Sequence, residues 1–142
     1  MAIHESGEDY LEAILMIQKR NGNVRSIDIA HELSFSKPSV SVAMKNLKAS
    51  NYITIDENGF INLTETGQEI ADKIYERHTF LTGWLTSIGV DPKVAAEDAC
   101  KMEHAISAES FSAIKKSIAG THENYSNPRK LSLIHISEPT RR

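Results

Sequence analysis

The sequence predicts a mainly α-helical protein, with an N-terminal winged helix-turn-helix followed by an all-helical dimerisation domain. Two short helical segments joined by a tight connection at residues 34–36 are typical of a helix-turn-helix. Two alternating apolar segments then flank Asn58-Gly59, which is the pattern of a β-hairpin, or wing. Over residues 64–118, apolar side chains recur with helical periodicity.

The first helix is expected to have Ser6 as its N-cap and acidic residues in its first turn, where the helix dipole favours them. It is expected to end at Asn21-Gly22-Asn23. Its wide apolar face consists of Tyr10, Leu11, Ile14, Leu15 and Ile17. Asp9 and Glu12 lie off most of this stripe, so their simplest interpretation is a dipole-favourable first turn.

The helix-turn-helix is predicted from Ser26, which is expected to cap a helix over 27–33. Ser36 is expected to cap the next helix, in which Pro38 occupies the first turn, where its missing N–H costs nothing. The predicted buried stripe of this helix is Val40, Ala43, Met44 and Leu47. The side chains that face outward are Lys37, Ser39, Ser41, Val42 and Lys45. Small hydroxyls on that face would let the helix sit deep in a DNA major groove.

Three further helices are expected after the hairpin, over 64–88, from 91 onward and over 107–118. Phe80 and Trp84 on the first of them are expected in a core or a dimer contact. The predicted domains are a winged helix over 1–72, a helical metal-binding and dimerisation domain over 73–120, and a disordered or non-native tail over 121–142.

The charge distribution indicates an anionic partner for one segment. The 142 residues carry a net charge of −3, yet the stretch from Lys19 to Ser50 has six basic and two acidic side chains. DNA is the expected partner, and a merely solvated basic face is the alternative. The single cysteine allows no internal disulfide, and the apolar runs are too short to cross a bilayer, so a cytoplasmic location is expected.

The predicted ligand of the helix-turn-helix is double-stranded DNA, because the second helix of this motif lies in the major groove. Helix N-terminal N–H groups and hydroxyls suit phosphate, and basic side chains add electrostatic attraction. The predicted contact residues are Arg25, Ser36, Lys37, Pro38, Ser39, Ser41, Val42 and Lys45.

Cys100, Glu103 and His104 are spaced i, i+3, i+4, so on a helix their side chains leave one face. Thiolate, carboxylate and imidazole are common ligands of divalent transition metals. One turn supplies only part of a site, and the chain offers a second set of such side chains in Asp9, Glu12 and His78. The alternative is that Glu103 and His104 are solvated surface groups and that Cys100 is a small buried residue.

With these motifs combined, the chain resembles the diphtheria toxin repressor family, which includes the manganese transport regulator. The resemblance covers about residues 5–118. It is carried by residues 8–12, 36–41, 63–67, 77–78 and 100–104. It implies a homodimer that binds operator DNA when it is loaded with divalent metal and that represses metal-uptake genes.

The resemblance also implies a set of metal ligands. One position matches Asp9, Cys100, Glu103 and His104, and a second matches Glu12 and His78. Cys100 is typical of the iron-type members and Asp9 of the manganese-type members, so the implied metal is Fe²⁺ or Mn²⁺. The chain departs from the iron-type pattern at Thr82 and Ala96, where that pattern has another carboxylate and a histidine.

Two other classes of function are alternatives to this one. A winged-helix regulator that senses a non-metal signal would not need the Cys100 cluster and would be insensitive to chelators. A small metallohydrolase could use the same ligands, but the sequence supplies no oxyanion-donor loop or substrate-cleft motif. The chain is therefore not expected to be an enzyme.

Overall fold

The computed structural model of the chain describes residues 5–126. The chain divides into two compact units, Met1–Thr79 and Phe80–Arg142. The division falls inside one helix, α4 (Glu65–Ser87). None of the helices among residues 5–126 combines the length and hydrophobicity that crossing a bilayer requires. The part of the predicted tail over 127–142 lies outside the described residues.

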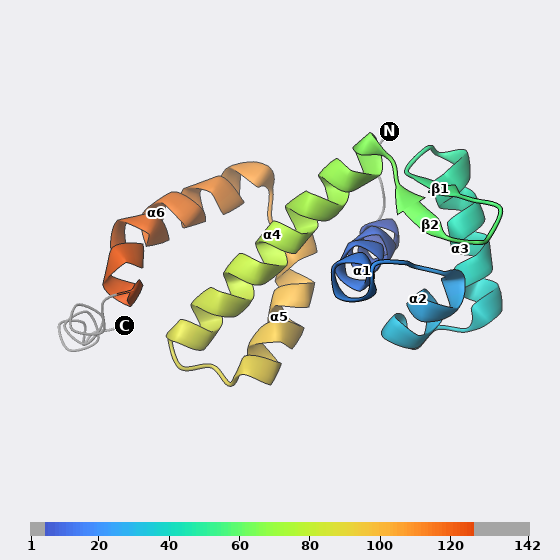
Figure 1. The fold of residues 1–142 in the computed structure, drawn as a ribbon. Coiled ribbons are helices and arrows are strands. Elements are labelled where there is room, and N and C mark those ends of the chain that lie inside the picture. The colour runs from blue at the N-terminus through green and yellow to red at the C-terminus, as the bar shows by residue number, and fades with distance from the viewer. Residues whose placement is uncertain (1–4, 127–142) are drawn as a thin grey trace. The chain divides into compact units, whose positions relative to one another are not determined.

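The first unit is a winged helix-turn-helix, as predicted (Figure 1). Its elements are α1 (Glu5–Asn21), α2 (Ser26–Leu33), α3 (Lys37–Ala49), β1 (Ile53–Ile55), β2 (Ile61–Leu63) and the first part of α4. Two helix starts differ from the prediction, because Ser6 lies inside α1 and Arg25, not Ser26, is the N-cap of α2. The Asp28 carboxylate accepts a hydrogen bond from the Arg25 N–H (2.9 Å), which is the role expected of a capping-box acid.

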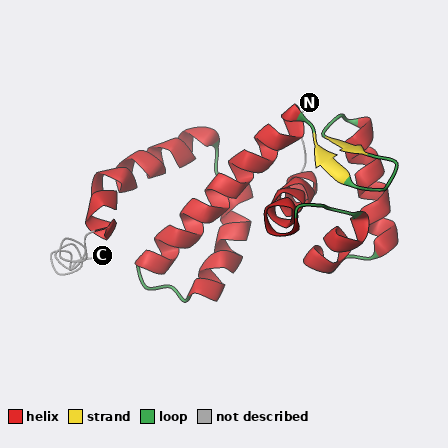
Figure 2. Ribbon diagram, viewed as in Figure 1, coloured by secondary structure: helices red, strands yellow, loops and turns green. Residues whose placement is uncertain are grey.

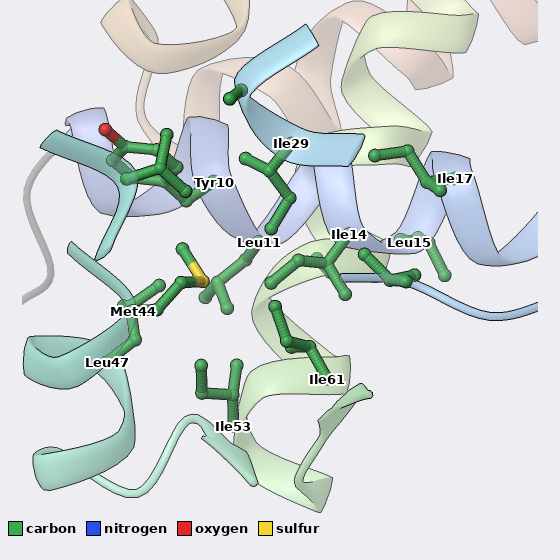
Figure 3. Close-up of a cluster of buried hydrophobic side chains, with 14 residues drawn as sticks. Tyr10, Leu11, Ile14, Leu15, Ile17, Ile29, Met44, Leu47, Ile53 and Ile61 are labelled. Carbon is green, nitrogen blue, oxygen red and sulfur yellow. The ribbon is translucent and has the colours of Figure 1, made fainter. Parts of the chain in front are cut away.

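The core of this unit lies among α1, α2, α3 and the two strands (Figure 3). Leu11 and Ile14 of α1 are fully buried and contribute the centre of the cluster. The other elements each add at least one aliphatic side chain, among them Ile29, Met44, Ile53 and Ile61. This packing fixes which side of α3 faces inward and therefore which side it presents to solvent.

The hairpin forms at the predicted place, from β1 and β2 paired antiparallel. Asp56 organises its turn, since its carboxylate accepts hydrogen bonds from the N–H groups of Asn58 and Phe60 (both 2.9 Å). Gly59 completes the turn with φ of +82°, a backbone conformation that residues with a side chain rarely adopt. The wing is therefore a short ribbon with a tightly defined tip.

The start of α4 packs closely against the segment that follows α3. The Thr64 hydroxyl donates to the carbonyl of Asn51 (2.7 Å) and accepts from the Gly67 N–H (3.1 Å). The Thr64 N–H donates to the carbonyl of Tyr52 (3.0 Å). A Cβ at position 67 would overlap that same Tyr52 carbonyl oxygen. Glycine is thus required here by lack of space, although its φ is ordinary.

The second unit is all-helical, as predicted, with the last part of α4, α5 (Pro92–Ala105) and α6 (Ala108–Ser126) (Figure 2). Asp91 caps α5 by accepting from the Lys93 N–H (3.0 Å), and Ser107 caps α6 by accepting from the Ser110 N–H (3.0 Å). Phe80 packs edge-to-face on Phe111 with ring centroids 5.6 Å apart and is partly buried. The buried side chains of this unit include Leu81, Ala95, Ala99 and Phe111.

The last helix is longer than predicted. The sequence predicts a change of character at Gly120, whereas α6 continues to Ser126. Residues 121–126 contain neither proline nor a further glycine, so no local steric feature opposes helix propagation there. The prediction relied on the loss of apolar periodicity, which reports burial of a helix face rather than helix formation.

Candidate nucleic-acid interface and metal ligands

α3 has two chemically different faces. Val40, Met44 and Leu47 are buried, and Ala43 is partly buried beside them, as predicted. Ser36 caps the helix as predicted, because its Oγ accepts a hydrogen bond from the N–H of Ser39 (3.2 Å). All of the predicted DNA-contact residues are exposed: Arg25, Ser36, Lys37, Pro38, Ser39, Ser41, Val42 and Lys45. A polar and basic helix face of this kind can bind phosphate and reach base edges.

A concave surface of about 360 Å³ lies between α2 and α3. It is lined by Ser26 and Ile27 from the start of α2 and by Lys37 and Ser41 from α3. Ser26 and Ile27 were not among the predicted DNA-contact residues. A signal was available, since both begin a helix and the N-terminal end of a helix attracts anions.

Arg25 connects the wing to the helix-turn-helix. Its guanidinium carbon lies 4.5 Å from the centroid of the Phe60 ring, in cation–π geometry. Next to it, the carbonyl of Val24 accepts a hydrogen bond from the Ile61 N–H of β2 (2.8 Å). The segment before α2 is thus attached to the wing through a backbone hydrogen bond and a side-chain contact, and Arg25 is exposed.

The predicted ligands of the first unit lie on α1 and α4. A carboxylate oxygen of Glu12 and a ring nitrogen of His78 lie within 4.8 Å of each other. The structure buries Glu12 (6% exposed), so its expected role as a polar first-turn residue is wrong. The physical reason is that α1 is buried on all sides over 10–15 and not only along one stripe.

Asp9, one turn before Glu12, is only partly buried. Its carboxylate lies within 4.8 Å of that of Glu5, also on α1. Glu5 was not among the predicted ligands, although the i, i+4 spacing of these two acids was a usable signal. Two carboxylates this close form an anionic site that a cation would stabilise.

The predicted cluster of the second unit lies on one turn of α5. Ligand atoms of Cys100 and Glu103 lie within 4.8 Å of each other, and His104 Nε2 is 3.4 Å from Glu103 Oε2. Glu103 is fully buried and Cys100 is exposed. Both observations contradict the alternative interpretation, in which Glu103 was solvated and Cys100 buried.

These donors fit a divalent transition metal. Each unit contributes carboxylate and imidazole, and the second adds a thiolate, which are the ligand types such ions prefer. Burial of Glu12 and Glu103 strengthens the attraction of each carboxylate for a cation, because the surroundings screen it poorly. Thr82 and Ala96, the two departures from the iron-type pattern, add neither a carboxylate nor an imidazole.

Two known protein families together match nearly all of the residues that the structure describes. Residues 2–59 match the family described as "Iron dependent repressor, N-terminal DNA binding domain". Residues 64–128 match the one described as "Iron dependent repressor, metal binding and dimerisation domain". The second range contains His78, Cys100, Glu103 and His104, and the first contains the exposed face of α3.

Individual relatives agree. An HTH-type transcriptional regulator of Methanocaldococcus jannaschii is 36% identical over 113 residues, which are 78% of this chain and 90% of the relative. The HTH-type transcriptional regulator MntR of Listeria innocua is 31% identical over 136 residues, covering 96% of this chain and 94% of the relative. Transcriptional regulator MntR of Escherichia coli O157:H7 is 32% identical, with 76% and 70% covered.

Solved structures show the same fold. The manganese regulator SloR is similar with a TM-score of 0.70 and 26% identity, and IdeR of T. acidophilum with a TM-score of 0.70 and 23% identity. In both comparisons the match covers 84% of this chain but 55% of the solved chain. The present chain thus spans about half the length of these two proteins.

Proposed function

Since this chain belongs to the iron-dependent repressor family, we propose that it is a transcriptional repressor that binds operator DNA when it is loaded with a divalent metal ion. The observation that carries the proposal is the exposed, hydroxyl-rich and basic face of α3, held outward by a fully apolar opposite face. Members of such a family regulate transcription and are not enzymes. We further propose a cytoplasmic location and retain the domain limits 1–72, 73–120 and 121–142 as working limits.

On DNA, α3 would act as the recognition helix of each protomer in a homodimer. Its N-terminal residues would contact base edges, while Lys37, Lys45 and Arg25 would neutralise phosphates. Half-sites of an inverted repeat one helical turn apart require the two recognition helices to be about 34 Å apart. DNA affinity therefore depends on anything that fixes the orientation of the DNA-binding unit within the dimer.

For the metal, we propose Asp9, Cys100, Glu103 and His104 as the principal ligands, with Glu12 and His78 as a second set. The close ligand pairs within each unit support this assignment. A divalent ion would supply positive charge and directional coordination to these side chains. The thiolate of Cys100 favours Fe²⁺, and the carboxylate of Asp9 favours Mn²⁺. The similar protein SloR is described as a manganese regulator.

The proposed ligands come from both compact units, which suggests how metal and DNA binding are linked. Ligands that share one ion cannot move independently, so metal loading would restrict the DNA-binding unit to fewer orientations. If those orientations fit the operator, the metal ion and the DNA must each tighten the binding of the other by the same factor. Chelation would then weaken DNA binding without unfolding either unit.

The test is a fluorescence-anisotropy titration of the full chain. The duplex would be an inverted repeat obtained by selection from a random library with metal-loaded protein. Titrations with chelator, Fe²⁺ (anaerobically), Mn²⁺ and Zn²⁺ are expected to show tight binding only with metal. Equal affinity in chelator would refute metal dependence while leaving DNA binding intact.

A variant then tests the ligand set. His104→Ala is expected to remove the metal response, while unfolding of the metal-free variant stays close to wild type. Lys101→Ala is the matched control, because Lys101 is exposed on the same turn of α5. A full metal response in His104→Ala would exclude His104 as a ligand.

A further inference from the structure

Val42 stands out on the exposed face of α3. Its side chain is 58% exposed, the largest exposed fraction among the large hydrophobic residues that the structure describes. Its neighbours one turn away on the helix surface are all exposed as well: Pro38, Ser39, Lys45 and Asn46. Val42 is therefore a single branched apolar group within a polar and basic face.

In the free protein this choice of residue has no evident benefit. A β-branched residue is a weaker helix former than alanine or lysine, because its χ1 freedom is lost against the preceding turn. Val40 on the opposite face recovers that cost by complete burial, whereas Val42 does not. A local choice that opposes helix formation without a compensating contact is expected at functional positions.

We propose that Val42 reads the C5-methyl group of a thymine, and so specifies a T·A pair at one position in each half-site. This inference rests on the proposed function, since it requires α3 to lie in the major groove. The thymine methyl is the only apolar group that a base pair presents there, and apolar side chains recognise it by contact. Valine has no hydrogen-bonding group, so it cannot read the other bases by donor and acceptor pattern.

The position of Val42 suits this role. It lies in the first two turns of α3, the part of a recognition helix that approaches base edges. The buried stripe of Val40, Met44 and Leu47 directs position 42 to the opposite side. Lys37 and Lys45, one on either side along the helix, are placed to approach the phosphates that flank such a groove.

Docking of another protein on this surface is the competing explanation. A protein interface needs a contiguous apolar patch, and every helical neighbour of Val42 is proline or polar. The surrounding lysines also favour a polyanion over an apolar surface. Nucleic acid is therefore the occupant that fits both the isolated methyl groups and the charge.

The experiment replaces thymine by deoxyuridine, which removes only the C5-methyl group. In the selected inverted-repeat duplex, each thymine is replaced in turn, and the Kd of the metal-loaded full chain is measured by anisotropy. One symmetric pair of thymines is expected to lose affinity by about fourfold per half-site, the effect of leaving one methyl group unburied.

Val42→Ala is expected to bind more weakly than wild type and to abolish the discrimination between thymine and uracil at that pair only. Val94→Ala is the matched control, because Val94 is also an exposed helical valine (44%) but lies on α5. It is expected to keep the wild-type thymine-to-uracil ratio at every position.

Two results would overturn the inference. Either no thymine is sensitive to loss of its methyl group in wild type, or Val42→Ala keeps the same ratio at the sensitive pair. In both cases DNA binding itself persists, so the proposed function survives. Absence of duplex binding under all metal conditions would instead refute the proposed function, and the inference with it.

Discussion

Replacement of Gly67 by alanine tests how α4 is joined to the winged helix-turn-helix. A methyl group at this position would overlap the carbonyl oxygen of Tyr52. That oxygen belongs to the backbone and accepts the hydrogen bond from the Thr64 N–H (3.0 Å), so it cannot rotate away. The chain must therefore shift, and the contacts made by Thr64 must weaken.

The magnitude follows from three contributions. Forcing an extra methyl group into a packed site costs about 1–3 kcal/mol. Weakening the hydrogen bond between Thr64 and Tyr52 costs about 1 kcal/mol. Alanine in place of glycine within a helix returns about 0.5–1 kcal/mol. The net loss in unfolding free energy is about 2 kcal/mol, which lowers the melting temperature of a unit of this size by roughly 8–16 °C.

The assay is urea unfolding of the full chain in chelator, monitored by circular dichroism at one fixed protein concentration. Gly83→Ala is the matched control, because Gly83 lies in the same helix and a Cβ there would meet nothing within 4 Å. That variant is expected to be as stable as wild type or up to about 1 kcal/mol more stable. A Gly67→Ala protein at least as stable as wild type would refute the steric argument.

Two further predictions concern residues that we propose to bind DNA and metal. Arg25→Ala removes a charge that we propose to bind phosphate, together with its contact with Phe60, so the slope of log K against log salt for DNA binding is expected to fall by about 1 per protomer. An unchanged slope, measured by anisotropy over a salt series, would remove Arg25 from the interface. Cys100→Ser exchanges a soft thiolate for a hard hydroxyl, so calorimetry is expected to show a larger loss of affinity for Fe²⁺ and Zn²⁺ than for Mn²⁺. Because Cys100 is exposed, the melting temperature of the Cys100→Ser variant in chelator should stay at the wild-type value. Equal losses of affinity for all three metals would argue against thiolate coordination.

Local signals were sufficient for the helix-turn-helix and its interface. The alternation of buried and exposed residues along α3, its Ser36 cap and the hairpin around Asn58-Gly59 are each properties of a few neighbouring residues. For that reason they could be predicted from the sequence. The exposure of the α3 residues predicted to contact DNA follows directly, because the buried stripe determines the opposite face.

Features that depend on tertiary packing were not predictable in the same way. Glu12 looks like a surface acid in the sequence, yet it is buried because several elements pack around α1. Ser26 and Ile27 could have been noted as a helix start, but the concave surface that they form with Lys37 and Ser41 depends on how α2 and α3 pack. The length of α6 was underestimated because the loss of apolar periodicity after Gly120 was taken as the end of the helix.

The hydrogen bond between Ile61 and Val24 has a consequence for the order of folding. A two-stranded ribbon is barely stable by itself, so the wing depends on an attachment to a segment far back in the chain. That attachment closes a long loop, whereas α2 and α3 form from neighbouring residues and can pack early. We therefore expect the wing to be the last part of this unit to form and the first to open, with faster amide hydrogen exchange than the helices beneath it.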